Sequence, residues 1–322
     1  MNRILVVGAT GQLGRAAIRK LAARGATLRA MVRTEAATRQ FQQQGIATVL
    51  ADLTDRRSLD AACAGIQTIV ATANSALPAR PADSFANVER DGYRNLIAAA
   101  QNAGVRHIVY TSFQGTNHGG SRFLRYKRET EEALQSSGIP STVFRAGIFM
   151  DIAFAMMGSD LPLRGVEGAS ILRPFHFTTR HFAGIRNSIA EKQVALVPGK
   201  GDRKHPFICV DDVASYLAAA ALGNQSGVYI IGGPEPLSYL DVVRLYERVL
   251  GVSLKVKSTP AFVFRVLSVA LKPFNPAGAN LMYLNYLSCT HSTQSDATAP
   301  ATFGVRLTTA ESFLRQKLSL SA

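Results

Sequence analysis

The 322-residue sequence predicts an α/β fold, a doubly wound parallel sheet followed by a smaller, mixed C-terminal part. Three observations support this prediction. An apolar run at residues 3–7 leads into a glycine-rich turn, short apolar runs then alternate with helical patterns, and the alternation stops near residue 150. We therefore expect residues 1–150 to form one α/β domain. Residues 151–322 should pack on it, interleaved in one compact unit, with the active site in the cleft between the two parts.

Hydrophobic residues make up 47% and charged residues 18% of the chain, as in water-soluble globular proteins. No apolar run approaches the roughly 18 residues needed to cross a bilayer, and the N-terminal run lacks the cleavage site of a signal peptide. Cys63, Cys209 and Cys289 are widely spaced and follow no metal-binding pattern. We expect reduced thiols and a cytoplasmic protein.

The net charge of +14 comes from basic residues spread along the whole chain. Nucleic-acid binders usually concentrate such charge in one patch or on one helix. We therefore do not expect nucleic-acid binding. The charge is better interpreted as a diffuse attraction for anionic ligands such as a dinucleotide phosphate.

The first strand, residues 3–7, is continuously apolar, as is typical of a parallel strand buried on both faces. It ends in the loop GATGQLG, residues 8–14, and a helical pattern follows. Gly8 allows a tight turn, Gly11 lets the backbone approach a pyrophosphate, and Gly14 lets the helix pack against the strand. The helix N-terminus then directs N–H groups at the phosphates. This context predicts a Rossmann-type dinucleotide site with six cofactor-binding candidates: Gly8, Thr10, Gly11, Gln12, Leu13 and Gly14.

The second strand, residues 27–32, ends at Arg33. In a dinucleotide fold this end faces the adenosine ribose, where an acid binds a free 2′-hydroxyl and an arginine accommodates a 2′-phosphate. Arg33 therefore favours NADP(H) over NAD(H), with Arg15 placed to assist; the alternative is that Arg33 is a solvated surface charge. The third strand ends in Asp52 and Leu53, which we expect to border the adenine.

The fourth strand, residues 68–72, leads to Ala73 and Asn74, which we place near the nicotinamide. A long helix over residues 85–103 and a fifth strand over residues 107–111 follow. This alternation of strands and helices is what predicts the parallel, doubly wound sheet.

Together these segments resemble the short-chain dehydrogenase/reductase superfamily, and most of all its atypical, NmrA-like branch, which also contains isoflavone-reductase-like enzymes and NADPH-dependent quinone reductases. The resemblance covers about the first half of the chain. It rests on five motifs in order: GATGQLG (8–14), VR (32–33), ADL (51–53), RNLIAAAQNAGVRHIVYTS (94–112) and KRETEEALQSSGIPSTVFRAGIFMD (127–151). It implies an NADP(H)-binding reductase of a small molecule, with residues 151–322 on the substrate side.

In ordinary members of the superfamily a tyrosine donates the proton, and a lysine four residues later lowers its pKa and holds the ribose. A serine at the end of the fifth strand orients the substrate oxygen. Here Lys127 is in register with the lysine, but Phe123 replaces the tyrosine. Phe113 stands where the serine is common, and the adjacent Ser112 is a catalytic candidate. In the isoflavone-reductase-like enzymes, the corresponding lysine is thought to handle the proton.

The resemblance thus makes Lys127 the leading catalytic candidate, either as a proton relay or only as a clamp on the nicotinamide ribose. Arg125 and Arg128 would lower its pKa if they are close, whereas Glu131, one turn along, would raise it. Tyr126 is a further candidate acid, although on a helix it points about 100° away from Lys127. It reaches the site if the helix begins only at Lys127; otherwise it is a packing or surface tyrosine.

The second half is less regular. Residues 145–150 are typical of a sixth strand, and Ser238 with Asp241 predicts the start of a helix that runs through residue 250. The segment 174–182 gathers three phenylalanines, two histidines and an arginine. It forms either the wall of a pocket for a flat substrate or ordinary core packing. We expect no metal site there, because its two histidines lack nearby carboxylates or cysteines.

Residues 261–271, AFVFRVLSVAL, are apolar and framed by Lys255, Lys257 and Lys272. The segment is too short to span a bilayer. It is either an interfacial or partner-binding helix, or a helix that packs on the substrate side of its own domain. The oligomeric state is left open.

Two functions follow. The first is an NADPH-dependent reductase that transfers hydride to a small planar carbonyl, enone or quinone. A quinone is a good acceptor whose reduction needs little acid–base chemistry from the protein, so the loss of the tyrosine would cost little. The alternative is a non-catalytic NADP(H)-binding redox sensor or assembly factor, which Phe123 and Phe113 favour.

Overall fold

A computed structural model of the chain describes residues 3–80, 82–115, 121–172 and 177–320. The chain forms two compact units, each built from three segments. Unit 1 comprises Met1–Arg145, Asp211–Tyr229 and Thr298–Val305. Unit 2 comprises Ala146–Val210, Ile230–Ala297 and Arg306–Ala322.

The largest sheet has seven strands: β1 (Arg3–Val7), β2 (Thr27–Val32), β3 (Ala47–Leu50), β4 (Thr68–Ala71), β5 (His107–Phe113), β6 (Ser141–Ala146) and β8 (Gly227–Ile231). Their order is β3-β2-β1-β4-β5-β6-β8. Strand β1 pairs in parallel with β2 and β4, β2 with β3, and β4 with β5. This order is that of dinucleotide-binding folds, whose ligand lies where the order reverses, here beside the carboxyl ends of β1 and β4. The predicted doubly wound parallel sheet is confirmed.

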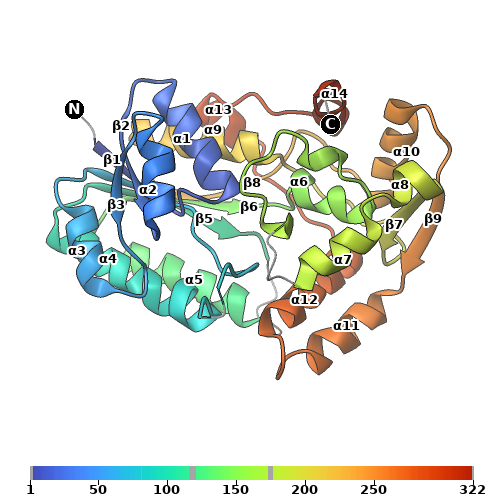
Figure 1. The fold of residues 1–322 in the computed structure, drawn as a ribbon, viewed down its shortest axis with the longest axis horizontal. Coiled ribbons are helices and arrows are strands. Elements are labelled where there is room, and N and C mark those ends of the chain that lie inside the picture. Colours follow the sequence, from blue (N-terminus) through green and yellow to red (C-terminus); the bar gives the residue numbers. More distant parts are fainter. Residues whose placement is uncertain (1–2, 81, 116–120, 173–176, 321–322) are drawn as a thin grey trace. The chain divides into compact units, whose positions relative to one another are not determined.

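Unit 1 carries these helices: α1 (Gln12–Ala22), α2 (Glu35–Gln42), α3 (Arg56–Cys63), the π-helix η1 (Ala86–Gly92), α4 (Tyr93–Asn102), α5 (Arg122–Ser136), α9 (Val210–Leu222) and α13 (Ala299–Phe303). Helices α1 and α2 lie over one face of the sheet, and α3, α4 and α5 lie along the other (Figure 1). Because both faces are covered, β1 from Ile4 onward and all of β4 are buried. This burial explains their uninterrupted apolar sequence.

Two elements differ from the sequence-based expectation. The helix expected over residues 85–103 begins with the π-helical turn η1 and becomes α-helical only at Tyr93. The sixth strand, expected at residues 145–150, lies at Ser141–Ala146, and Met150 instead begins a helix. Met150 is buried in the core of unit 2, so its apolar character reflects that packing and not the sheet.

Unit 2 contains a parallel pair of strands, β7 (Val194–Pro198) and β9 (Lys255–Thr259). Its helices are α6 (Met150–Ala153), η2 (Ala155–Met157), η3 (Leu161–Leu163), η4 (Ser170–Leu172), α7 (Phe177–Ile185), α8 (Ser188–Lys192), α10 (Tyr239–Leu250), α11 (Ala261–Ala270), α12 (Pro276–Thr290) and α14 (Ala310–Ser319). The core gathers large side chains, among them Phe154 directly after α6, Tyr246 of α10 and Phe313 of α14. The predicted helix start at Ser238 is confirmed, because Ser238 and Asp241 form a reciprocal capping box.

The aromatic segment 174–182 is only partly described. Residues 174–176 lie outside the described residues, and Phe177–Ile185 is helix α7. The ring of Phe182 is buried in a small cluster with Leu163 and Ile171. For Phe182, core packing is therefore the correct alternative; the pocket wall remains a prediction for the rest.

Candidate cofactor site and active site

The glycine loop follows β1 and is shaped by its own backbone. Gly8 has a φ of +85°, in the left-handed region that glycine adopts without strain, and its carbonyl accepts a hydrogen bond from the N–H of Gly11 at 3.0 Å. A Cβ on Gly14 would lie 2.2 Å from the same carbonyl oxygen. A side chain at position 14 would thus push α1 away from the loop.

The N-terminus of α1 has no side-chain cap. Gly11 is the N-cap, and no acidic residue lies in the first turn. A Cβ on Gly11 would meet only the carbonyl of Gly8, at 3.4 Å. Thr10 is exposed, and Gln12 and Leu13 are half-buried. This arrangement of backbone amides and positive helix dipole, with no side-chain cap, fits the diphosphate of a dinucleotide.

The loops after β1 and β4 adjoin at the point where the strand order reverses. A Cβ on Gly8 would lie 2.6 Å from the backbone nitrogen of Ala73. The carbonyl of Ala73 accepts a hydrogen bond from the Tyr93 hydroxyl, and Asn74 is exposed next to it. The predicted Gly8, Ala73 and Asn74 positions are therefore brought together.

Arg33 is engaged in an ion pair. Its guanidinium donates to both carboxylate oxygens of Asp83, at 2.9 and 3.1 Å, and its side chain is about one third exposed. Arg80 also binds Asp83, at 3.0 Å, and reaches Asp52 at 2.6 Å. The two arginines thus share one carboxylate at the end of β2. A 2′-phosphate would offer the same guanidinium groups a second anionic partner.

Asp52 and Leu53, both expected to border the adenine, differ in environment: Asp52 is paired with Arg80, and Leu53 is buried. Burial would raise the pKa of Asp52, but hydrogen bonds from Thr54 and the ion pair with Arg80 outweigh it and lower that pKa. Asp52 is therefore an anion held by Arg80. Leu53 is buried, and its Cβ lies where a side chain on Gly92 would be. Leu53 thus packs against Gly92 at the end of η1.

Lys127 lies in the interior, 2% exposed, with its ammonium 2.9 Å from a carboxylate oxygen of Glu89. Glu89 belongs to the π-helical turn η1 and is completely buried. Its other oxygen accepts hydrogen bonds from the backbone N–H and the hydroxyl of Ser75. Lys127 also donates to the carbonyl of Thr111 at 3.3 Å. This lysine and this glutamate therefore form a buried ion pair with further polar contacts on both sides.

Three aromatic rings surround the ammonium of Lys127. Its Nζ atom lies 4.8 Å from the ring centroid of Tyr110 and 5.5 Å from those of Tyr93 and Phe123. Burial raises the pKa of both tyrosines well above the usual range, so both stay protonated. Phe123, at the position of the missing tyrosine, therefore serves as one wall of an aromatic box.

Tyr126 points away from Lys127. Tyr126 was expected to reach the site only if the helix began at Lys127. Helix α5 begins earlier, at Arg122, so this condition is not met. The ring of Tyr126 lies instead beneath the guanidinium groups of Arg90 and Arg125, at 5.3 and 5.0 Å. This is the packing alternative for Tyr126.

Ser112 belongs to a separate buried cluster. Its hydroxyl donates to Glu131, which also binds Arg128 and Arg145. Burial is the largest influence on Arg128 and lowers its pKa, against the opposing effect of Glu131. Arg128 and Glu131, which were expected to act on the pKa of Lys127, thus bind each other.

The chain matches the sequence profile of the NmrA-like family over residues 1–293. It belongs to the NmrA-like family. Among similar proteins, (4-alkanoyl-5-oxo-2,5-dihydrofuran-3-yl)methyl phosphate reductase of Streptomyces griseus is 28% identical over 276 residues, 84% of this chain and 82% of that protein. Photosystem II assembly factor Ycf39 of Trieres chinensis is 25% identical over 271 residues, 82% and 74% of the two chains. Quinone oxidoreductase 2 of Escherichia coli is 31% identical over 150 residues, 46% of this chain and 49% of that protein.

Solved structures resemble this NmrA-like chain over almost its full length. The NADPH complex of the Escherichia coli quinone oxidoreductase QOR2 superposes with a TM-score of 0.72 at 22% identity, covering 98% of this chain and 100% of that one. The NADP(H) complex of Citrobacter sp. triphenylmethane reductase gives 0.72 at 18% identity, covering 98% and 99%. At these identities the likeness is one of fold.

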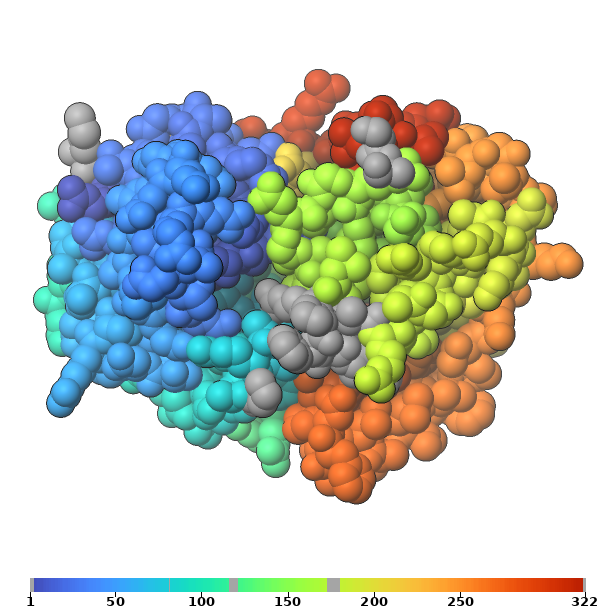
Figure 2. All heavy atoms as spheres, viewed as in Figure 1, coloured from blue at the N-terminus to red at the C-terminus, as the bar shows by residue number. Residues whose placement is uncertain are grey.

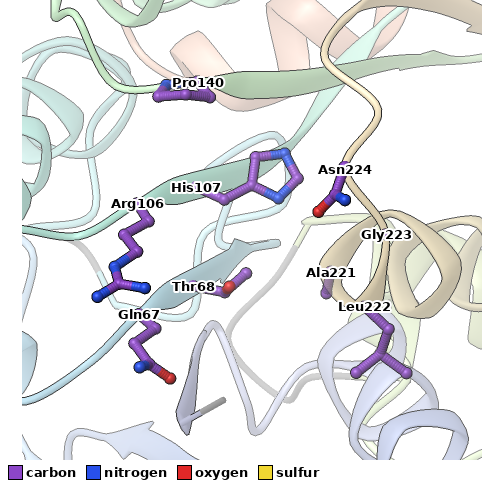
Figure 3. Close-up of a pocket in the computed structure, with 9 residues that line it drawn as sticks. All are labelled: Gln67, Thr68, Arg106, His107, Pro140, Ala221, Leu222, Gly223 and Asn224. Atoms are coloured by element: carbon purple, nitrogen blue, oxygen red, sulfur yellow. The ribbon is translucent and has the colours of Figure 1, made fainter.

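A cavity of about 480 Å³ in the NmrA-like unit 1 lies away from the glycine loop. It is found at the amino ends of β4 and β5, lined by Gln67, Thr68, Arg106, His107, Pro140, Ala221, Leu222, Gly223 and Asn224 (Figure 3). His107 contacts the hydroxyl of Thr142 at 2.8 Å, and burial lowers its pKa. The glycine loop follows the carboxyl end of β1, whereas this cavity lies at the amino ends of the parallel strands, on the opposite side from the expected ligand site.

Sequence reasoning missed Glu89, Asp83 and Arg80. The sequence contains an indication of the role of Glu89. This acid follows Phe85 by one helical turn and lies on the apolar stripe that Leu96 continues. An acid on such a stripe is expected to be buried and paired. Asp83 and Arg80 gave no such signal, because they lie in an irregular segment. Among the residues that the structure describes, no group of three potential metal ligands gathers, and no helix is long and apolar enough to cross a membrane.

Proposed function

We propose that this chain is an NADPH-dependent reductase that transfers hydride to a small planar carbonyl, enone or quinone. The observation that carries the proposal is the uncapped N-terminus of α1 behind Gly8, Gly11 and Gly14, placed where the strand order reverses. Relatives named as a furanone phosphate reductase, a quinone oxidoreductase and an NAD(P)H azoreductase support the reaction class. NADPH supplies the hydride when bound.

We infer a preference for NADP(H) over NAD(H) from the end of β2. Arg33 and Arg80 converge there on a single carboxylate, Asp83, and a 2′-phosphate would be a second anionic partner for their guanidinium groups. The loop residues Thr10, Gln12 and Leu13, with Ala73 and Asn74, complete the proposed cofactor contacts. Asp52 is proposed to act here by holding Arg80 in place.

In this proposal the chain contributes binding and orientation more than proton transfer. An ammonium has three N–H donors, so Lys127 can hold a ribose hydroxyl while it stays paired with Glu89, whereas loss of a proton from Lys127 would leave the Glu89 carboxylate buried without its cation. Ser112 and Tyr126 are occupied elsewhere, the first by Glu131 and the second beneath two arginines. A quinone suits such a site, because solvent can supply its protons after hydride transfer. A cytoplasmic location remains part of the proposal; Cys63 is a buried free thiol, as a reducing compartment allows.

A second candidate is a non-catalytic NADP(H)-binding sensor or assembly factor. The observation that favours it is the buried ion pair of Lys127 with Glu89, because a proton lost from Lys127 would leave a buried carboxylate without its cation. A relative named as a photosystem II assembly factor points in the same direction.

One experiment separates the two functions. The purified protein is titrated with NADPH and NADH by calorimetry, and NADPH oxidation is then followed against a panel of quinones and enones. Turnover with at least one acceptor supports the reductase; tight NADPH binding without turnover on any acceptor supports the sensor. If neither dinucleotide binds, both are wrong. If Lys127→Ala leaves NADPH affinity and turnover unchanged, the placement of Lys127 at the site is wrong.

A further inference from the structure

Helix α11 and the turn after it expose large apolar side chains on unit 2. Four of them are more than half exposed: Phe262 (68%), Val266 (59%), Val269 (58%) and Phe274 (87%). The first three are spaced by four and three residues, so they share one face of the helix. We call these four residues the α11 apolar face.

The other side of α11 is packed and holds the helix in place. Phe264 is half-buried and Ser268, one turn later, is buried. The guanidinium of Arg265 lies over the rings of Tyr283 and Tyr286 of α12, at 5.8 and 6.0 Å from their centroids. Helices α11 and α12 lie side by side in Figure 1, and both are open to view in orange in Figure 2. The segment therefore packs on its own unit with one side and presents the other to solvent.

The charged residues next to this face in the sequence have one sign. The sequence contains no aspartate or glutamate between Glu247 and Asp296, and in that stretch it carries five cations: Arg248, Lys255, Lys257, Arg265 and Lys272. Lys255 and Lys257 lie exposed on β9, directly before α11, and Lys272 is exposed two residues before Phe274. Glu247, the acid that precedes this stretch, is engaged locally, because its carboxylate accepts a hydrogen bond from the backbone N–H of Leu254 at 2.9 Å.

We propose that the α11 apolar face and Lys255, Lys257 and Lys272 form a peripheral binding surface for anionic lipid bilayers. Exposed aromatic and aliphatic side chains can enter the boundary between headgroups and acyl chains, while lysines beside them bind the anionic headgroups. The ten residues of α11 extend only about 15 Å, so the helix lies along a bilayer surface and does not cross it. The proposal does not depend on cofactor binding.

Charge argues against the alternative occupants. A second copy of the chain would bring the same lysines opposite one another, which is unfavourable. A nucleic acid would use the lysines but leave Phe262 and Phe274 without a partner. An anionic bilayer satisfies both the cations and the apolar side chains.

The test is cosedimentation of the full chain with vesicles of phosphatidylcholine alone and of equal parts phosphatidylcholine and phosphatidylglycerol. Binding should be confined to the anionic vesicles and should weaken as salt rises, because salt screens the lysines. Lys255→Gln/Lys257→Gln/Lys272→Gln should lower the partition coefficient by about 100-fold, from a factor of about five for each lysine near the surface. Phe262→Ser/Phe274→Ser should also reduce binding.

Matched controls separate this surface from the general charge of the chain. Arg24→Gln/Arg57→Gln/Arg106→Gln removes the same charge from exposed positions in unit 1. Val228→Ser/Leu318→Ser removes two exposed apolar side chains elsewhere. Both controls should bind anionic vesicles like the unsubstituted protein, and thermal unfolding should show every variant folded.

Three outcomes would overturn the proposal. The first is no binding to anionic vesicles by the unsubstituted protein. The second is an equal loss in the lysine variant and its arginine control, which would mean that binding follows net charge alone. The third is a change of oligomeric state in solution with Phe262→Ser/Phe274→Ser and no change in vesicle binding, which would make the face a contact between copies of the chain.

Discussion

The glycine loop and the surroundings of Lys127 both belong to unit 1, but they differ in how many of their polar groups already have partners within the protein. At the loop, no side chain caps α1, and Gly11 keeps the space before the first turn clear. Around Lys127, the ammonium already has a carboxylate, a backbone carbonyl and three aromatic rings as neighbours. The loop retains hydrogen-bonding capacity for an anion, whereas the Lys127 cluster uses much of its own capacity within the protein.

The structure is therefore better arranged for binding a diphosphate at α1 than for proton transfer by Lys127. A diphosphate can approach α1 without displacing any side chain that caps it. Proton transfer from Lys127 would leave the carboxylate of Glu89 buried without its cation, which is energetically unfavourable unless another cationic or hydrogen-bonding partner compensates it. Substitutions in these two regions, and in the charged cluster of Arg33, Arg80, Asp52 and Asp83, should differ in size of effect in the same way.

Glu89→Gln should destabilise the protein most, by about 3–5 kcal/mol, because it leaves the Lys127 ammonium buried without its carboxylate. Urea denaturation followed by circular dichroism measures the free energy of unfolding. The double variant Glu89→Gln/Lys127→Met removes both charges and should recover most of the loss. A single variant as stable as the unsubstituted protein would show that the pair is not sealed from water.

Gly14→Ala should lower the free energy of unfolding by about 1–3 kcal/mol, since its Cβ would overlap the carbonyl oxygen of Gly8. Gly11→Ala is the matched variant in the same loop. It has room for the Cβ, so its unfolding temperature should stay close to that of the unsubstituted protein while its NADPH affinity falls. Equal unfolding temperatures for the two variants would contradict this assignment of the two glycines.

Arg33→Ala should weaken NADPH binding by about 1–3 kcal/mol, the value of a charge-assisted contact with a phosphate, and should change NADH binding much less. Calorimetric titration with both dinucleotides measures the difference. Arg39→Ala, which removes an exposed arginine of α2, is the control and should leave both affinities unchanged. Equal losses for NADPH and NADH in Arg33→Ala would argue against a preference for NADP(H).

The smallest effect concerns acid. The pKa of Asp52 is lowered in the folded protein, so this group adds stability above its unfolded pKa, and that stability is lost as pH falls through the folded value. Because Asp52 and Arg80 are partly exposed, the contribution should stay below about 1 kcal/mol. The stability difference between the unsubstituted protein and Asp52→Asn should therefore shrink as the pH is lowered below about 4. A difference independent of pH would show that the Arg80 contact adds nothing.

Much of the candidate cofactor site could be predicted from the sequence because its causes are local. Gly8, Gly11 and Gly14 act through backbone geometry within seven consecutive residues of the sequence. The charge partners could not be predicted in the same way. Arg33 and Asp83 are 50 residues apart in the chain, and no periodic pattern connects them. The cofactor contacts and the catalytic roles of Lys127, Ser112 and Tyr126 remain predictions.

By itself, the sequence determined the parallel sheet, the turn after β1 and the start of α10. Hydrophobic periodicity, left-handed glycines and helix caps each depend only on residues near one another in the chain. Tertiary structure alone decided that Lys127 pairs with Glu89, that Tyr126 lies beneath two arginines, and that α11 leaves one face exposed. Which charges meet, and which apolar side chains are covered, depends on how distant segments pack.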